Sequence, residues 1–241
     1  MDILHFDTID STYYNNKNCY NTVFRLFNPL RNIKNIYLKS LEMPITFDNI
    51  RDDNTSNVID IKMNNLTFNR ILSTKNYTNI NTLLSDINAV LAGTNITFTI
   101  VDGIVSINFP HIANTRIGNN VLMNYVLGFP KDTEYLSTNK VTATNNYNLN
   151  YDNYLSLYLD IPSSNNASSS KKISFKIPLN ALENMVFYLG DNSTFSQSIK
   201  MSDPNYVLAQ FQITVYDRFG YTISQCLDYT FTLGIDYDAT F

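Results

Sequence analysis

The chain has 241 residues, 44% of them hydrophobic, so it is long enough to bury a sizeable core as one or two domains. Its formal net charge is −4, only 16% of its residues are charged, and no block of Lys or Arg stands out. This excludes the basic footprint of a nucleic-acid binder, and no segment approaches the roughly 18 uninterrupted apolar residues of a membrane span.

The first 20 residues predict a polar N-terminal arm. The segment YYNNKNCY has no hydrophobic period, and MDILHFDTID lacks the apolar stretch of a signal peptide. We therefore expect the chain to be made and kept in the cytoplasm. Its two cysteines, Cys19 and Cys226, fit reduced thiols there better than a disulfide, and the sequence leaves their pairing open.

Two strands are expected next, within TVFRLFNPLRNIKNIYLKSLEM at residues 22–43. Pro29 marks the turn between them, and Pro44 ends the second strand because proline has no N–H for the sheet ladder. Residues 48–57 read as a loop. VIDIKM and LTFNRIL then predict two short strands around Asn64 and Asn65.

The clearest helix is predicted in NINTLLSDINAVLAG, where apolar residues recur at helical spacing. Asn79 or Asn81 can cap its start, and Gly93 can end it. Directly after it, ITFTIV and IVSINF flank Asp102–Gly103, a dipeptide that tolerates positive φ at both central turn positions. This is the strongest hairpin signal in the chain.

Residues 131–153 are polar and read as a loop. YLSLYLDI then alternates, with leucines on one face and Tyr154, Ser156 and Tyr158 on the other. Further apolar runs bring the total to about twelve strands and one helix. Short strands separated by turn signals predict an all-β fold, an antiparallel β-sandwich or barrel.

The residues that carry chemistry in enzymes are sparse. The two histidines, His5 and His111, lie in no nucleophile motif, and no metal-ligand spacing or glycine-rich phosphate loop occurs. Alternate aspartates near the C-terminus fit a solvated strand end better than a cation site. We therefore expect no catalytic residue, no cofactor and no metal.

The stretch QITVYDRFGYT poses the one real choice, between a catalytic Asp217–Arg218 pair and a sheet corner. An aspartate at a strand end accepts backbone N–H groups in a turn, and Gly220 can supply the unusual backbone angles. The sheet corner is favoured, because no partner groups for catalysis can be named.

Tyrosine is abundant, with 17 residues, and tryptophan is absent. Aromatic side chains are enriched at protein interfaces, so outward-facing tyrosines are candidate interface residues. The alternative is a sandwich whose tyrosine hydroxyls simply reach solvent. The candidates are Tyr13, Tyr14, Tyr154 and Tyr158.

The order of several short motifs resembles that of a viral family. A strand pair ending in EMP, a helix with LLSDIN, the TFTIVDGIVSINF hairpin, VLGF and later DRFG follow one another between Val23 and Ile235. This order resembles minor capsid and penton-type proteins of large icosahedral DNA viruses of eukaryotes and of their virophages.

The resemblance implies a single jelly roll, a double-sheet sandwich, preceded by the arm and carrying an insertion at about residues 49–131. Two β domains split near residues 145–153 are the alternative. It further implies a structural virion protein rather than an enzyme, a homo-oligomer with a pentamer favoured, and the major capsid protein as partner. The competing hypothesis is a spike or fibre module that binds a host glycan or protein.

Overall fold

The chain forms two compact units. The terminal unit comprises Met1–Phe47 and Asp152–Phe241, and the inserted unit comprises Asp48–Tyr151. The insertion thus starts one residue before its expected start and continues past its expected end at residue 131, to the place where the two-domain alternative was split. The computed structural model describes residues 1–11, 21–44, 47–118, 122–130, 133–162, 174–179, 186–188, 198–203, 205–224 and 228–238.

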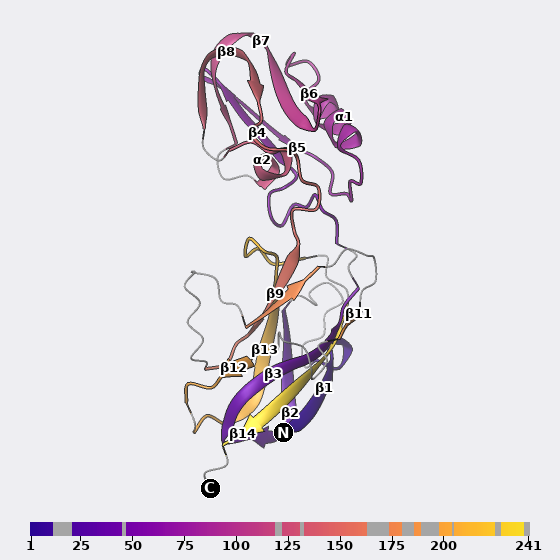
Figure 1. Ribbon diagram of the computed structural model, residues 1–241, viewed down its shortest axis with the longest axis vertical. Helices are drawn as coiled ribbons and strands as arrows, with labels where there is room; N and C mark the ends of the chain where they lie inside the picture. The colour runs from indigo at the N-terminus through magenta and orange to yellow at the C-terminus, as the bar shows by residue number, and fades with distance from the viewer. Residues whose placement is uncertain are drawn as a thin grey trace. The chain divides into compact units, whose positions relative to one another are not determined.

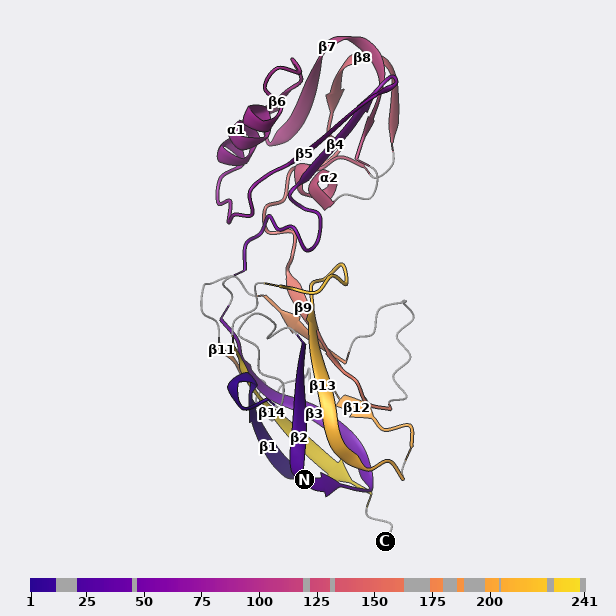
Figure 2. The same ribbon diagram turned by 180° about the vertical axis from the view of Figure 1, so that it is seen from behind.

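The described residues of the terminal unit form two antiparallel sheets (Figures 1 and 2). In sheet A, β1 pairs with β14 and β14 pairs with β3. The other edge of β3 pairs with β12 near its start and with β11 near its end. In sheet B the order is β10-β9-β13-β2. The bounds are β1 Asp2–Asp7, β2 Asn21–Leu30, β3 Ile33–Glu42, β9 Tyr154–Leu159, β10 Phe175–Pro178, β11 Val186–Tyr188, β12 Ser198–Lys200, β13 Leu208–Tyr216 and β14 Thr230–Tyr237.

The strand pairing is that of a jelly roll. The first strand β1 pairs with the last, β14, and β2 pairs with the second-last, β13. Strand β3 pairs with β11 and β12, and the middle strands β9 and β10 pair with each other. Such a set is one long antiparallel hairpin wound into two facing sheets, so the predicted single jelly roll is observed.

The expected N-terminal arm needs correction. Residues Asp2–Asp7 form β1, which pairs with β14 over its full length, and a short 3₁₀ turn follows at Thr8–Asp10. Leu4 and Phe6 pack against the core, so alternating apolar residues in the segment ILHF recruit it to the sheet. The rest of the predicted arm, from residue 12 to residue 20, lies outside the described residues.

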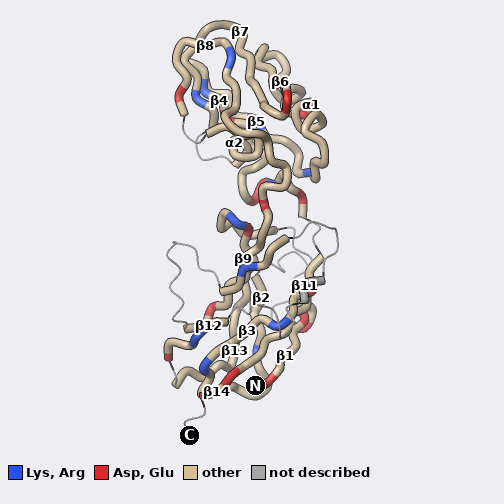
Figure 3. Tube along the Cα trace, in the orientation of Figure 1, with Lys and Arg blue, Asp and Glu red and all other residues tan. Residues whose placement is uncertain are grey.

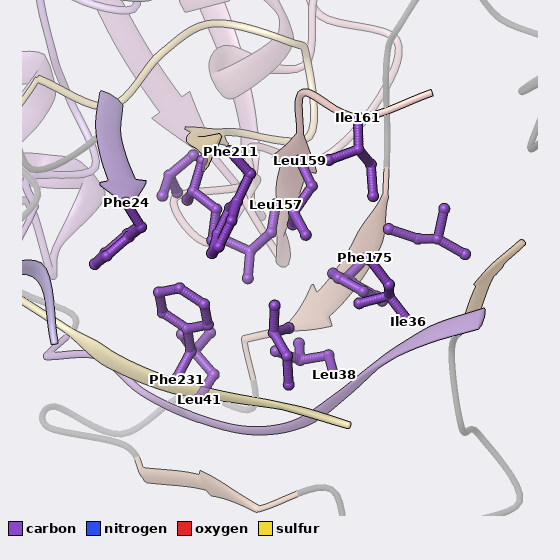
Figure 4. Close-up of a cluster of buried hydrophobic side chains, with 14 of the residues drawn as sticks. Phe24, Ile36, Leu38, Leu41, Leu157, Leu159, Ile161, Phe175, Phe211 and Phe231 are labelled. Carbon is purple, nitrogen blue, oxygen red and sulfur yellow. The ribbon is translucent and has the colours of Figure 1, made fainter. Parts of the chain in front are cut away.

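The core of the terminal unit lies between its two sheets (Figure 4). Four phenylalanines from β1, β2, β13 and β14 form its aromatic part. The rings of Phe6 and Phe231 stack with centroids 5.0 Å apart, those of Phe24 and Phe211 stack at 5.5 Å, and Phe6 meets Phe211 edge to face at 5.1 Å. Such contacts add to the burial free energy, so this cluster fastens both sheets together.

The described residues of the inserted unit form a five-stranded sheet and two helices. Strand β8 lies along one edge of the long strand β7, and β6 and β4 lie in series along the other, with β5 beyond β4. Asn88 ties α1 to β6 by bonding both the N–H and the C=O of Phe98. The bounds are β4 Val58–Met63, β5 Leu66–Ile71, α1 Ile80–Val90, β6 Thr97–Val101, β7 Ile104–Ile117, α2 Leu122–Leu127 and β8 Glu134–Thr142.

The helix predicted after Asn79 is confirmed as α1, and the Asn79 side chain accepts the N–H of Asn81 at its start. Two expectations were wrong in this unit. Residues 134–142 form the edge strand β8, not loop, because most of its side chains face solvent and leave no apolar alternation. A second short helix, α2, was also missed.

The two ends of the inserted unit are joined by side-chain hydrogen bonds. Asn49 donates from Nδ2 to the carbonyl of Leu149, and the Tyr151 hydroxyl donates to the carbonyl of Asn49 and accepts from Asn54 Nδ2. The Arg51 side chain is fully buried beside them, with its Nε 2.8 Å from Asp53 Oδ1. We call Asn49, Asn54 and Tyr151 the clasp of this unit.

Candidate assembly surfaces and a polar pocket

Asp217 forms the corner that follows β13. Its Oδ1 accepts the backbone N–H groups of Phe219 at 2.8 Å and Tyr221 at 2.9 Å, and its own N–H donates to the Tyr221 carbonyl. Gly220 has φ +88°, a left-handed conformation that L-residues adopt at a cost. This carboxylate is therefore occupied in organising a turn between Tyr216 and Thr222, which pair as an isolated bridge.

Arg218 belongs to the same corner. Its backbone N–H donates to Asp152 Oδ1 at 3.1 Å, and its guanidinium donates to Asn153 Oδ1 at 3.3 Å. These contacts hold the corner against the start of β9. The second predicted turn, Asp102–Gly103, closes the β6–β7 hairpin with φ of 51° and 78°.

His5 lies in a cross-strand polar ladder on sheet A. Its Nδ1 is 2.8 Å from Thr232 Oγ1, which also accepts a hydrogen bond from Ser40 Oγ at 2.8 Å. The three residues are direct neighbours in the register of β1, β14 and β3. The three side chains therefore link neighbouring strands on one face of sheet A.

Two of the tyrosines named from the sequence lie on the outer face of β9. The rings of Tyr154 and Tyr158 are half-buried there, opposite the buried leucines. Lys176 Nζ lies 4.0 Å from the centroid of Tyr154, a cation–π contact, and the Tyr158 hydroxyl donates to Asp160. Tyr13 and Tyr14 lie outside the described residues.

The most exposed large apolar side chain in the described part of the chain is Phe27, at 99%. It lies on β2, the edge strand of sheet B, where residues 26–29 stand opposite Ala209 alone in β13. A bulge of this size pushes side chains out of the sheet.

Strand β1 is the edge of sheet A on the same side of the sandwich as β2, because Phe6 and Phe24 are in ring contact at 5.2 Å. On β1, Ile3 is 55% exposed. We call the two edge strands β1 and β2 the lateral edge of the terminal unit; Ile3 is exposed on the outer face of sheet A, and Phe27 is exposed on the bulge of β2. The β1 part of this surface was not predicted, because the first 20 residues were expected to form an arm.

Charge is not concentrated on either unit. Basic and acidic residues are interspersed along the described parts of the trace (Figure 3). Among the described residues, no group of three or more His, Cys, Asp or Glu side chains is placed to hold a metal ion. No helix in the described part of the chain has the length and hydropathy needed to cross a membrane.

A polar pocket of about 510 Å³ opens in the inserted unit. One wall is the segment 76–78, which precedes α1, the other is the segment 147–150, which follows β8, and Asn49 lies between them. Tyr77 is buried in the first wall, where its hydroxyl donates to Asp86 Oδ2 at 2.7 Å. Burial and this bond raise the pKa of Tyr77 well above its ordinary value, so the phenol stays neutral.

No protein-family model matches the chain, and no curated protein matches it. Among solved structures, the chain is similar to the mavirus penton protein, with 12% sequence identity, a TM-score of 0.40, and 98% of this chain and 99% of that chain covered. It is also similar to a chain of the Sputnik virophage structure from electron cryomicroscopy, with 12% identity, a TM-score of 0.31, and 97% and 98% covered. Both similarities extend over nearly the whole sequence at low identity.

Proposed function

We propose that the chain is a structural virion protein, a minor capsid or penton subunit that self-assembles and contacts the major capsid protein. The order of its sequence motifs supports this proposal, as does the jelly-roll pairing of its strands. In this proposal the protein is made in the host cytoplasm and ends in the virion, and it performs no chemical reaction.

The observation that carries the proposal is the lateral edge of the terminal unit. A phenylalanine that is 99% exposed on a bulged edge strand gains about 1.5–3 kcal/mol when a partner buries it. In a ring of identical subunits, one side of each jelly roll meets a different side of its neighbour, and the contact closes on itself. The lateral edge suits one half of such a contact.

Oligomeric state is the first test. We expect the purified chain to form a closed oligomer, with a pentamer favoured, in size-exclusion chromatography with light scattering. Phe27→Asp places a charge on the proposed contact and should weaken association at least about tenfold, or about 1.4 kcal/mol per contact. The matched control is Ile71→Asp, since Ile71 is 67% exposed but lies on the inserted unit.

Incorporation into particles is the second test. Co-expression with the major capsid protein of the same virus should place the wild-type chain in assembled particles, and Phe27→Asp should reduce the amount incorporated. A chain that stays monomeric at all concentrations and is absent from particles would contradict the proposal.

A further inference from the structure

The pocket of the inserted unit is held rigid by backbone contacts and by one side chain. Asn49 accepts the Tyr77 N–H at Oδ1 and donates from Nδ2 to the carbonyls of Tyr77 and Leu149. Its single amide therefore bridges both walls. The second wall is also fixed through the Asn148 N–H, which donates to the Val126 carbonyl at 2.8 Å. A pocket built this way needs little reorganisation to receive a ligand.

The side chains that face the pocket from these rigid walls are neutral hydrogen-bonding groups. Asn76, Thr78 and Asn150 are exposed, and their amides and hydroxyl make no hydrogen bond to other described residues. An amide offers two donors and one acceptor oxygen, and a hydroxyl offers both functions. The pocket thus presents donors and acceptors side by side.

Charge is absent from the described residues that line the pocket. Behind Tyr77, Lys75 and Asp86 carry opposite charges and pair at 3.4 Å. Burying an ion without a partner charge is unfavourable, so a phosphate, carboxylate or ammonium group is a poor fit. An uncharged ligand that both donates and accepts hydrogen bonds fits best.

Tyr147 adds an aromatic surface to this polar lining. Its ring is half-buried, and its backbone is anchored by the N–H bond to the Gly103 carbonyl at 3.4 Å. A half-buried aromatic ring at this position offers an apolar face to C–H groups next to a row of amides. Sugars combine these two requirements, because each pyranose ring has C–H faces and a rim of hydroxyls.

We propose that this pocket binds an uncharged carbohydrate, with Tyr147 contacting a sugar ring and Asn76, Thr78 and Asn150 bonding its hydroxyls. The volume of about 510 Å³ lies within the range of small-ligand sites. Sugar binding by the inserted unit and assembly through the lateral edge are independent, since the residues involved belong to different units.

The test is a ligand-observed NMR titration of the full chain with four neutral disaccharides, chitobiose, lactose, cellobiose and mannobiose, and with sialyllactose as an anionic comparison. We expect saturation transfer to at least one neutral disaccharide, with a dissociation constant on the order of 1 mM. Tyr147→Ala and the double variant Asn76→Ala/Asn150→Ala should each weaken it about tenfold.

The matched control is Asn69→Ala, which removes an exposed amide from β5, outside the pocket. Unchanged thermal unfolding of all variants shows that they remain folded. No saturation transfer to any neutral disaccharide, transfer in the pocket variants equal to that of the wild type, or stronger binding of sialyllactose than of the neutral sugars would each overturn the proposal. Oligomerisation is read by light scattering, so failure of either proposal leaves the other testable.

Discussion

The terminal unit and the inserted unit bring their ends together by different means. In the terminal unit, β1 and β14 pair along a backbone ladder from Asp2 to Asp7, and Phe6 stacks on Phe231 beneath it. In the inserted unit, the ends meet through the side chains of the clasp, Asn49, Asn54 and Tyr151. A segment whose ends are tied together can be placed in a loop of another fold, which needs only two adjacent attachment points.

The two units also differ in how far apart in sequence their paired strands lie. The jelly roll pairs the first strand with the last, so its closure depends on contacts between residues more than 200 positions apart, as in Thr8 Oγ1 and Asp228. The inserted unit contains two local hairpins, β4–β5 and β6–β7. Local pairing costs less loop entropy, so we expect the inserted unit to fold first.

The largest effect is expected from Phe231→Ala, which removes a ring that is 1% exposed from the aromatic core of the terminal unit. Such a change costs about 3–5 kcal/mol. Hydrogen exchange with mass spectrometry should show loss of protection in β13 and β14, while peptides of the inserted unit stay protected. Equal loss of protection in both units would show that they unfold together as one cooperative unit.

The control for this prediction is Phe27→Ala, the same substitution at an exposed position, studied at concentrations where oligomers dissociate. Its cost should stay within about 0.5 kcal/mol. A cost close to that of Phe231→Ala would mean that Phe27 contributes to the fold of the single chain.

The sequence predicts secondary structure correctly where neighbouring residues determine it. Asp102–Gly103 lies between two alternating runs, and the structure has a hairpin there. Asn79 precedes an apolar period of helical spacing, and the structure has a capped helix. Leu155, Leu157 and Leu159 alternate on β9 and are buried, as their period predicted. In each case a few adjacent residues are enough to predict the local structure.

The sequence did not predict local structure that depends on pairing with a segment far away in the chain. The strand predicted at IVSINF continues through Pro110 as part of the longer β7. The proline is tolerated because the pairing with β8 shifts register between Asn108 and Ala113, so no ladder N–H is needed there. Likewise, Leu4 and Phe6 form a strand only because β14 lies beside them. The pocket walls are far apart in sequence, and the Asn49 amide bonds to both of them.

A matched pair of glycines tests the packing of the inserted unit. Gly128 has φ +82°, and an added Cβ would lie 2.1 Å from the Asn145 carbonyl oxygen, whereas Gly93 has φ +84° and open space around it. Gly93→Ala should lower the unfolding free energy by about 1–2 kcal/mol, the cost of placing alanine in a left-handed conformation. Gly128→Ala should cost about 1–3 kcal/mol more, because backbone must move.

Urea unfolding of both glycine variants, followed through hydrogen exchange of α2 and β8, measures this difference. Equal losses of unfolding free energy in the two variants would mean that the backbone around Asn145 can move away from the added Cβ at no cost. In that case the inserted unit would be loosely packed compared with the aromatic core of the terminal unit.

The clasp is tested by Tyr151→Phe. This change removes the hydroxyl that donates to the Asn49 carbonyl and accepts from Asn54 Nδ2, and both asparagines lose a bond in a buried or half-buried site. We expect a loss of about 1–3 kcal/mol in the inserted unit. Its control, Tyr147→Phe, removes a hydroxyl from the same segment and should change the unfolding free energy by less than about 0.5 kcal/mol.

The smallest effect concerns the tie between the first and last strands of the terminal unit. The Tyr237 hydroxyl donates to Asp2 Oδ2 at 2.7 Å, and burial together with this bond raises the pKa of Tyr237 from 10.0 to about 12. A raised pKa means that the folded state favours the neutral phenol. The bond therefore stabilises the fold fully below pH 10, and its contribution is lost as the pH rises through 12.

Tyr237→Phe should accordingly lower the unfolding free energy of the terminal unit by a constant amount below pH 10, and this difference should shrink between pH 10 and 12. Tyr77 and Asp86 form an equivalent pair in the inserted unit, so Tyr77→Phe provides the parallel measurement. A difference at Tyr237 that does not change with pH would assign its effect to ring packing rather than to the hydrogen bond with Asp2.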